Sequence, residues 1–128
     1  METPILKQGP YLIATIQSAL NDTDLLELRD ALVAKVGKFR SRAVIMDVTS
    51  LDVMDSFSSR TLRDISHMIR LRGAETLIVG IQPEVAFAMT QLGLTLEGVA
   101  TALDLEEGLA YLDRKPAKSG GESRFRGR

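Results

Sequence analysis

Residues 43–62 read AVIMDVTSLDVMDSFSSRTL, and the period of their hydrophobic pattern changes partway along. The run opens with four apolar residues that include two β-branched side chains, too few for a helix and typical of a buried strand. From Leu62 onward, apolar residues recur three and four positions apart, which is helical spacing. The pattern therefore predicts a strand, a polar turn and a helix whose N-terminus lies at Asp55-Ser56.

This predicted helix has two chemically different faces. At 100° per residue one face carries Ser58, Leu62, Ile65 and Ile69, and the other carries Arg60, Arg63, Asp64, His67 and Leu71. The first backbone N–H groups of a helix lack intrahelical partners and favour a Ser or Asp side chain, or a bound anion. Ser56 precedes the helix and is expected to project towards Arg60 and Arg63. Ser56 is therefore the serine of this segment that is easiest to reach from outside.

Upstream of this segment the sequence predicts a hairpin and a helix. Two short apolar runs, 5–7 and 11–16, are separated by turn residues, which favours an antiparallel pair. Four residues with capping side chains then precede an apolar stripe at helical spacing. Asp24 and Glu27 have the spacing of a capping box, and Gly37 is expected to end this helix.

Downstream, strands and helices continue to alternate. Residues 76–79 predict a buried strand, 84–92 a helix, the region near Val99 a short strand, and 104–112 a final helix. The fold class is therefore α/β, with a mixed, mostly parallel sheet of four to five strands and about four helices. Residues 1–114 are expected to form one domain, followed by a basic, disordered tail at 115–128.

Composition excludes some classes of protein. The chain has 128 residues, a formal net charge of −1 and no cysteine, which leaves no disulfide, thiolate metal site or cysteine nucleophile. The near-zero charge gives no general attraction to nucleic acid or to an anionic membrane. No signal peptide is visible, and no apolar run approaches the roughly 20 residues that span a bilayer. We expect a cytoplasmic protein without nucleic-acid or membrane partners.

Enzymatic chemistry finds little support in the sequence. His67, the one histidine, follows Ser56 by eleven residues on the same helix, which places it roughly 15 Å away, beyond hydrogen-bond reach. Neither a Gly-x-Ser-x-Gly elbow nor a nucleotide-binding glycine motif occurs. Asp47, Asp52 and Asp55 cluster without the Gly and Glu of a calcium loop, so they are interpreted as turn and cap residues. We predict no catalytic residue, cofactor or metal.

A partner surface is a further possibility on the outward helix face. His67, Met68 and Leu71 lie on or near that face, and two of these side chains are apolar. Such residues favour a contact surface, although scattered apolar residues are also ordinary on protein surfaces.

The element order, together with Asp55-Ser56 at the N-terminus of a helix, resembles the STAS domain, the fold of bacterial anti-sigma-factor antagonists. The resemblance runs from about Ile5 to Leu112. The usual Asp-Ser-Ser-Gly or Asp-Ser-Thr-Gly of the family stands here as Asp-Ser-Phe-Ser, which is similar to the stressosome scaffold subgroup of the RsbS type. Two further segments carry the subgroup resemblance, VGIQPE at 79–84 and TALDLEEGL at 101–109.

The resemblance implies a non-enzymatic phospho-switch scaffold of the bacterial stressosome. Such a scaffold co-assembles with sensor-bearing paralogues of the RsbR type into a large particle, and a phosphatase is a further partner. The particle holds a serine/threonine kinase of the RsbT type until the kinase phosphorylates the scaffold and leaves. By the family pattern the phosphorylated serine is Ser56, with Ser58 and then Ser59 as further choices. Asp55, Arg60 and Arg63 are expected to support the switch. The alternative is a simple anti-sigma-factor antagonist that binds an anti-sigma kinase one-to-one.

Overall fold

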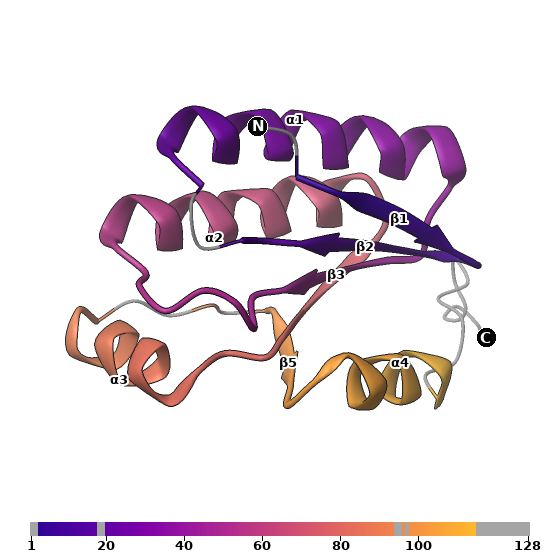
Figure 1. Cartoon of the computed structure of the whole chain (residues 1–128). Helices are drawn as coiled ribbons and strands as arrows, with labels where there is room; N and C mark the ends of the chain where they lie inside the picture. The colour runs from indigo at the N-terminus through magenta and orange to yellow at the C-terminus, as the bar shows by residue number, and fades with distance from the viewer. Residues whose placement is uncertain (1–2, 18–19, 94–95, 97, 115–128) are drawn as a thin grey trace.

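The computed structural model describes residues 3–17, 20–93, 96 and 98–114. Within these residues the chain forms one five-stranded sheet and four helices (Figure 1). The elements in chain order are β1 (Ile5–Gln8), β2 (Tyr11–Thr15), α1 (Asp22–Phe39), β3 (Ala43–Asp47), α2 (Ser56–Leu71), β4 (Glu75–Val79), α3 (Pro83–Gln91), β5 (Ala100–Ala102) and α4 (Leu105–Arg114). The predicted α/β fold and the predicted order of elements are confirmed.

The strands lie in the sheet in their chain order, β1-β2-β3-β4-β5. β1 pairs antiparallel with β2, so the predicted hairpin is present, and the pairs from β2 to β5 are all parallel. In register, Ile13 lies beside Ile45 and Ile45 beside Leu77. The sheet is therefore mixed and mostly parallel, as predicted.

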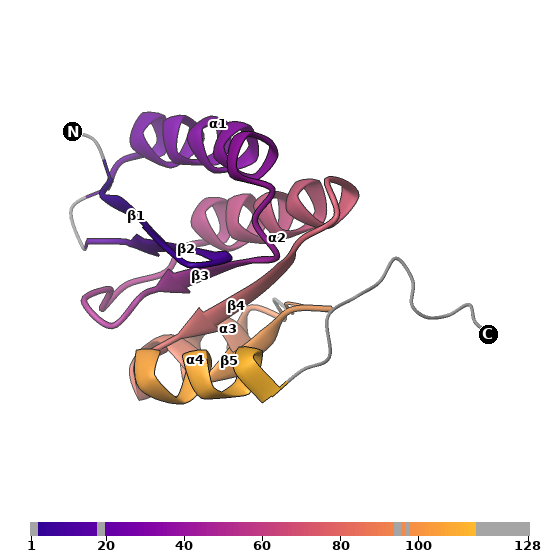
Figure 2. The same cartoon turned by 90° about the vertical axis from the view of Figure 1, so that its right-hand side faces the viewer.

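Helices cover both faces of the sheet. α1 and α2 lie side by side over one face and α4 lies on the other (Figures 1 and 2). Side chains of β3 alternate between the two layers, with Val44 and Met46 facing α1 and α2, and Ile45 facing α4. Val85 and Met89 of α3 join the first layer. Because the central strands are buried on both faces, they read as continuous apolar runs, which is what made them visible in the sequence.

The α4 layer depends on a close approach at Gly108. A Cβ at this buried position would lie 2.8 Å from Leu77 Cδ2 and 2.8 Å from Val79 Cγ1, closer than carbon atoms pack. The glycine therefore lets the backbone of α4 rest directly on β4. Leu112, also buried, packs in the same layer one turn further along the helix.

Both ends of α1 differ from the sequence prediction. Asn21 is the N-cap, and its side chain accepts a 2.8 Å hydrogen bond from the Asp24 backbone N–H, so the predicted capping box of Asp24 with Glu27 is wrong by one turn. The Asp24 carboxylate in turn accepts a hydrogen bond from the Asn21 backbone N–H. Gly37 does not end the helix. The helix continues to Phe39 and closes at Arg40, which adopts a left-handed conformation with φ 52°.

The last elements agree with the prediction to within a few residues. The short strand expected near Val99 is β5, and the final helix begins after Asp104, whose carboxylate accepts a 2.8 Å hydrogen bond from the Glu107 backbone N–H. The predicted tail at 115–128 lies outside the described residues. In the part of the chain that the structure describes, no helix is both long and apolar enough to cross a membrane.

Candidate functional site

The N-terminus of α2 is organised by Asp55. This residue is the N-cap, and its Oδ1 accepts a 2.7 Å hydrogen bond from the backbone N–H of Ser58. That bond, with a smaller contribution from the Ser58 side chain, holds the pKa of the Asp55 carboxyl below its ordinary value. Asp55 is exposed, so a charged carboxylate stands at the surface at the start of the helix. The predicted cap role of Asp55 is confirmed.

Three serines surround this cap in different environments. Ser56 is the first residue of α2 and is half-buried, as is Ser58. Ser59 is buried, with 3% of its surface exposed, and its hydroxyl finds no hydrogen-bond partner in the described part of the chain. An enzyme that modifies a serine needs its hydroxyl in the open. Exposure therefore favours Ser56 and Ser58 over Ser59 and does not distinguish Ser56 from Ser58.

A small pocket opens beside the start of α2. It has a volume of about 140 Å³, and apart from Asp55 and Ser58 its walls are apolar, formed by Ile16, Leu20, Leu25, Leu51, Val53 and Leu62. Ser58 does share the face of Leu62, as predicted, but stays half-buried because this pocket lies in front of it. Val53 is 72% exposed at the rim. The site is therefore a carboxylate and two serines next to an apolar depression.

The sequence did not reveal this pocket. Its walls come from the connection between β2 and α1, from α1, from the loop after β3 and from α2, so no local pattern contains them. The available signal was the apolar pair Val53-Met54 between the polar turn and Asp55, of which Val53 is 72% exposed.

The loop that leads to Asp55 is tied to the loop after β4. The carboxylate Oδ1 of Asp47 accepts hydrogen bonds from the Thr49 backbone N–H at 3.0 Å and from the Thr49 hydroxyl at 2.6 Å. Gln82 Nε2 donates a 2.6 Å bond to the Thr49 carbonyl. Gly80, with φ 81°, faces Thr49 so closely that a Cβ would collide with its side chain. These contacts fix the loop at the carboxyl edge of the parallel strands, where binding sites of α/β sheets commonly lie.

The outward face of α2 is polar with an apolar patch, as predicted. Arg60 lies near enough to Asp55 to favour its charged form, while Arg63 Nε stands 3.8 Å from the carboxylate of its neighbour Asp64. His67 and Met68 are exposed, and Leu71 is 88% exposed. These residues face solvent in the isolated chain, and nothing in the structure shows what contacts them.

The structure also bears on the chemistries that the sequence disfavoured. Ser56 and His67 lie on the same continuous helix, eleven residues and thus more than about 15 Å apart along its axis, so they cannot form a nucleophile–base pair. Asp47 and Asp55 are engaged as turn and cap carboxylates. Among the described residues, no group of three or more His, Cys, Asp or Glu side chains is placed to hold a metal ion.

Comparison with known proteins gives one family and a consistent set of relatives. The family profile described as the STAS domain matches residues 3–108. RsbT co-antagonist protein RsbRA of Bacillus subtilis (strain 168) is 35% identical over 92 residues, which cover 69% of this chain and 34% of RsbRA. The chain thus spans about a third of the length of that relative.

Two solved structures match over nearly their whole length. RsbS of Moorella thermoacetica, in a serine-to-glutamate variant, superposes with a TM-score of 0.76 at 33% identity, covering 87% of this chain and 94% of that one. A chain from a solved structure of the stressosome, described as a signal integration and transduction hub, superposes with a TM-score of 0.76 at 35% identity. The match covers 86% of this chain and 96% of that one.

Proposed function

Because this chain belongs to the STAS-domain family, we propose that it is a scaffold protein of a stressosome-type signalling particle, switched by phosphorylation of Ser56. The observation that carries the proposal is the match to RsbS of Moorella thermoacetica, which covers almost all of both chains at 33% identity. Similarity to the co-antagonist RsbRA supports the same setting. In this proposal the protein is cytoplasmic and non-enzymatic, and residues 1–114 form its STAS domain.

The proposed partners follow from these relatives. A serine/threonine kinase of the RsbT type is held by the assembled particle and phosphorylates the scaffold, and a phosphatase reverses the modification. Sensor-bearing paralogues of the RsbR type share the particle with this chain. The exposed face of α2 around His67, Met68 and Leu71 supports a contact with another protein, since Leu71 is 88% exposed.

Local structure around Ser56 supports its assignment as the phosphoacceptor. Ser56 follows the cap Asp55 and stands at the first position of α2, where backbone N–H groups lack intrahelical partners. A phosphate adds nearly two negative charges at that end of the helix, where the helix dipole favours them. Ser58 is second choice because it lines the pocket and its backbone N–H is already bound to Asp55, and Ser59 is buried.

The pocket next to Ser56 offers a surface where a phosphate on Ser56 would affect the binding of a partner. A kinase that packs over Val53 and the apolar depression covers the start of α2 as well. After phosphorylation the same partner would have to bury a dianion, which costs several kcal/mol unless it is fully compensated. The modification is therefore expected to release the kinase without unfolding the scaffold.

Phosphopeptide mapping tests the assignment. The chain, with Ser56→Ala and Ser58→Ala as a matched pair of variants, is incubated with an RsbT-type kinase and ATP. Wild type and Ser58→Ala are expected to incorporate phosphate at Ser56, and Ser56→Ala to incorporate almost none. Full labelling of Ser56→Ala would contradict the assignment.

Size-exclusion chromatography tests the scaffold role separately. Mixing the chain with an RsbR-type paralogue is expected to give a large particle that retains the kinase until ATP is added. A mixture that stays at the size of monomers and dimers, with kinase binding one-to-one, would refute the scaffold role and favour a simple antagonist.

A further inference from the structure

The first strand of the sheet leaves one of its sides unpaired. β1 is the outermost strand and pairs with β2 alone, next to the side of the sheet that α1 covers (Figures 1 and 2). The backbone N–H of Thr15 donates a 3.3 Å hydrogen bond to the carbonyl of Pro4. Backbone groups alternate in direction along an antiparallel strand, so Leu6 faces β2 as Pro4 does. The N–H and C=O groups of Ile5 and Lys7 therefore point away from the sheet.

This outer side of β1 is open and carries an apolar side chain. Within the described part of the chain, no backbone hydrogen bond from another segment reaches Ile5 or Lys7. Leu6 lies opposite Ile13, which packs in the α4 layer, so the side chain of Leu6 stands on the face of the sheet away from α1. Leu6 is 60% exposed there. An unpaired edge with a large apolar side chain at its centre is a place where a further strand can add.

The two ends of β1 differ in charge. A groove of about 620 Å³ lies between the start of β1 and α1, with Ile5 among its walls. Asp24 and Glu27 outnumber Lys35 among the charged walls of this groove. Towards the other end of β1, three lysine Nζ atoms lie 5.4–5.9 Å from the centre of the Phe39 ring, those of Lys7, Lys35 and Lys38. The edge is therefore acidic beside Ile5 and basic beside Lys7.

We propose that β1 is a self-association edge, to which β1 of a second copy of this chain adds antiparallel about a two-fold axis at Leu6. In this register Leu6 lies opposite the partner's Leu6, in a non-hydrogen-bonded pair, where side chains approach most closely. The two exposed leucines then cover one another. Ile5 lies opposite the partner's Lys7, so every outward backbone group of these two residues gains a hydrogen-bond partner.

The same register matches the charges of the two ends. Ile5 packs in the layer of α1, so the partner's Lys7 would lie on that face of the sheet, beside the groove that contains Glu27. Glu27 is exposed, and no ion pair engages it among the described residues. The ammonium group of the partner's Lys7 can therefore reach the Glu27 carboxylate. A register with the axis at Lys7 would instead place two lysines opposite each other, which is unfavourable.

Symmetry limits this association to two copies. A two-fold pair of β1 strands uses the open side of both strands and is closed. Pro4 and Pro10 bracket β1, and proline next to a short edge strand opposes longer pairing. The proposal is independent of the proposed function, because Ser56 lies on another element and the tests below use the chain without kinase or paralogue.

Sedimentation velocity of the chain alone, over about 1–200 μM, tests the edge. Wild type is expected to pass from monomer to dimer. Leu6→Glu sets two carboxylates face to face at the axis and is expected to weaken the dimer at least about tenfold. Leu103→Glu is the matched control, because Leu103 is 77% exposed and follows β5 at the far side of the sheet. The control is expected to dimerise like wild type, and circular dichroism checks that each variant folds.

A charge swap tests the register. Glu27→Lys and Lys7→Glu each bring like charges together across the interface, so each variant alone is expected to dimerise more weakly than wild type. In an equimolar mixture, every contact of the mixed dimer joins opposite charges. The mixture is therefore expected to dimerise more strongly than either variant alone, and failure to recover would overturn the proposed register.

Amide hydrogen exchange of the wild-type protein supplies a second readout. The amides of Ile5 and Lys7 are expected to exchange more slowly as the protein concentration rises, whereas that of Leu6 already faces β2 and should not change. A chain that stays monomeric would overturn the proposal, as would a dimer that Leu6→Glu leaves intact or that Leu103→Glu weakens equally. Growth of the chain alone beyond a dimer would overturn the closed two-fold arrangement.

Discussion

A charge placed at the start of α2 tests whether the proposed switch acts through binding or through folding. Ser56→Asp puts one negative charge at the first helical position, next to the cap Asp55. We expect the variant to fold as stably as Ser56→Asn, which has nearly the same shape and no charge. The comparison of these two variants isolates the effect of charge from the effect of side-chain size.

The expected magnitude follows from opposing terms at the helix end. The helix dipole stabilises a negative charge there by about 0.3–1 kcal/mol. Repulsion from Asp55, at roughly 6 Å in water, costs about 0.7 kcal/mol. Arg60, which already favours the charged form of Asp55, adds a small attraction. The terms nearly cancel, so the free energy of unfolding should change by less than about 1 kcal/mol, or about 4 °C in melting temperature for a domain of this size.

Thermal melts followed by circular dichroism, at low and high salt, make the measurement. Any difference between Ser56→Asp and Ser56→Asn is expected to shrink at high salt, because salt screens charges at the surface. A kinase pull-down on the same samples is expected to show much weaker binding by Ser56→Asp. A melting temperature more than about 8 °C below that of Ser56→Asn, about 2 kcal/mol, would mean that the charge acts through the fold and would refute this reasoning.

Two further predictions concern the cap and the end of the domain. Asp55→Ala removes the acceptor of the Ser58 N–H and should lower the free energy of unfolding by about 1 kcal/mol at neutral pH. Folding lowers the pKa of Asp55, so its carboxylate stabilises the folded state above the unfolded pKa of about 4, and this stabilisation is lost as the pH falls through the folded pKa. In urea denaturation the difference in unfolding free energy between wild type and Asp55→Ala should therefore shrink below about pH 4. A difference at about pH 3 equal to that at neutral pH would contradict this prediction. Truncation after Arg114 should leave melting temperature and assembly unchanged, whereas truncation before Asp104 removes α4 with the buried Leu112 and should cost several kcal/mol. Loss of assembly by the longer form would show that residues 115–128 make a contact.

Local patterns in the sequence were sufficient for the elements and their order. β3 and β4 are buried on both faces, so their apolar runs stand out, and the stripe of Leu62, Ile65 and Ile69 marks the face of α2 that packs inward. The cap at Asp55 was visible because an acceptor side chain preceded that stripe. These features depend on neighbours within a few residues, which is the range over which a sequence pattern is informative.

Helix ends were harder to predict because several residues competed for the same role. Four consecutive residues before α1 have side chains able to cap, and spacing alone could not tell that Asn21 takes the position. Gly37 looked like a helix stop, since glycine is the usual residue there. Its close neighbour is the side chain of Arg72, 35 positions later and directly after α2, and no local pattern connects the two.

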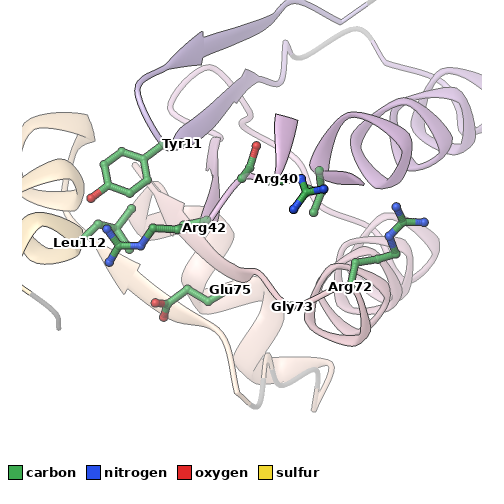
Figure 3. A pocket seen from close by; sticks show the side chains of 10 residues that line it. Tyr11, Arg40, Arg42, Arg72, Gly73, Glu75 and Leu112 are labelled. Atoms are coloured by element: carbon green, nitrogen blue, oxygen red, sulfur yellow. The ribbon is translucent and has the colours of Figure 1, made fainter. Parts of the chain in front are cut away.

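Both pockets were decided by tertiary structure. The pocket beside Asp55 takes walls from the connection between β2 and α1, from α1, from the loop after β3 and from α2, and a pocket at the opposite edge of the sheet draws on residues from Tyr11 to Leu112 (Figure 3). Helical and strand periods determine which residues share a face of one element, but the packing of elements on the sheet determines which faces meet. The sequence by itself therefore determined the architecture and the position of Ser56 at a helix start, while the packing of α1 and α2 against the sheet decided which surfaces lie open around it.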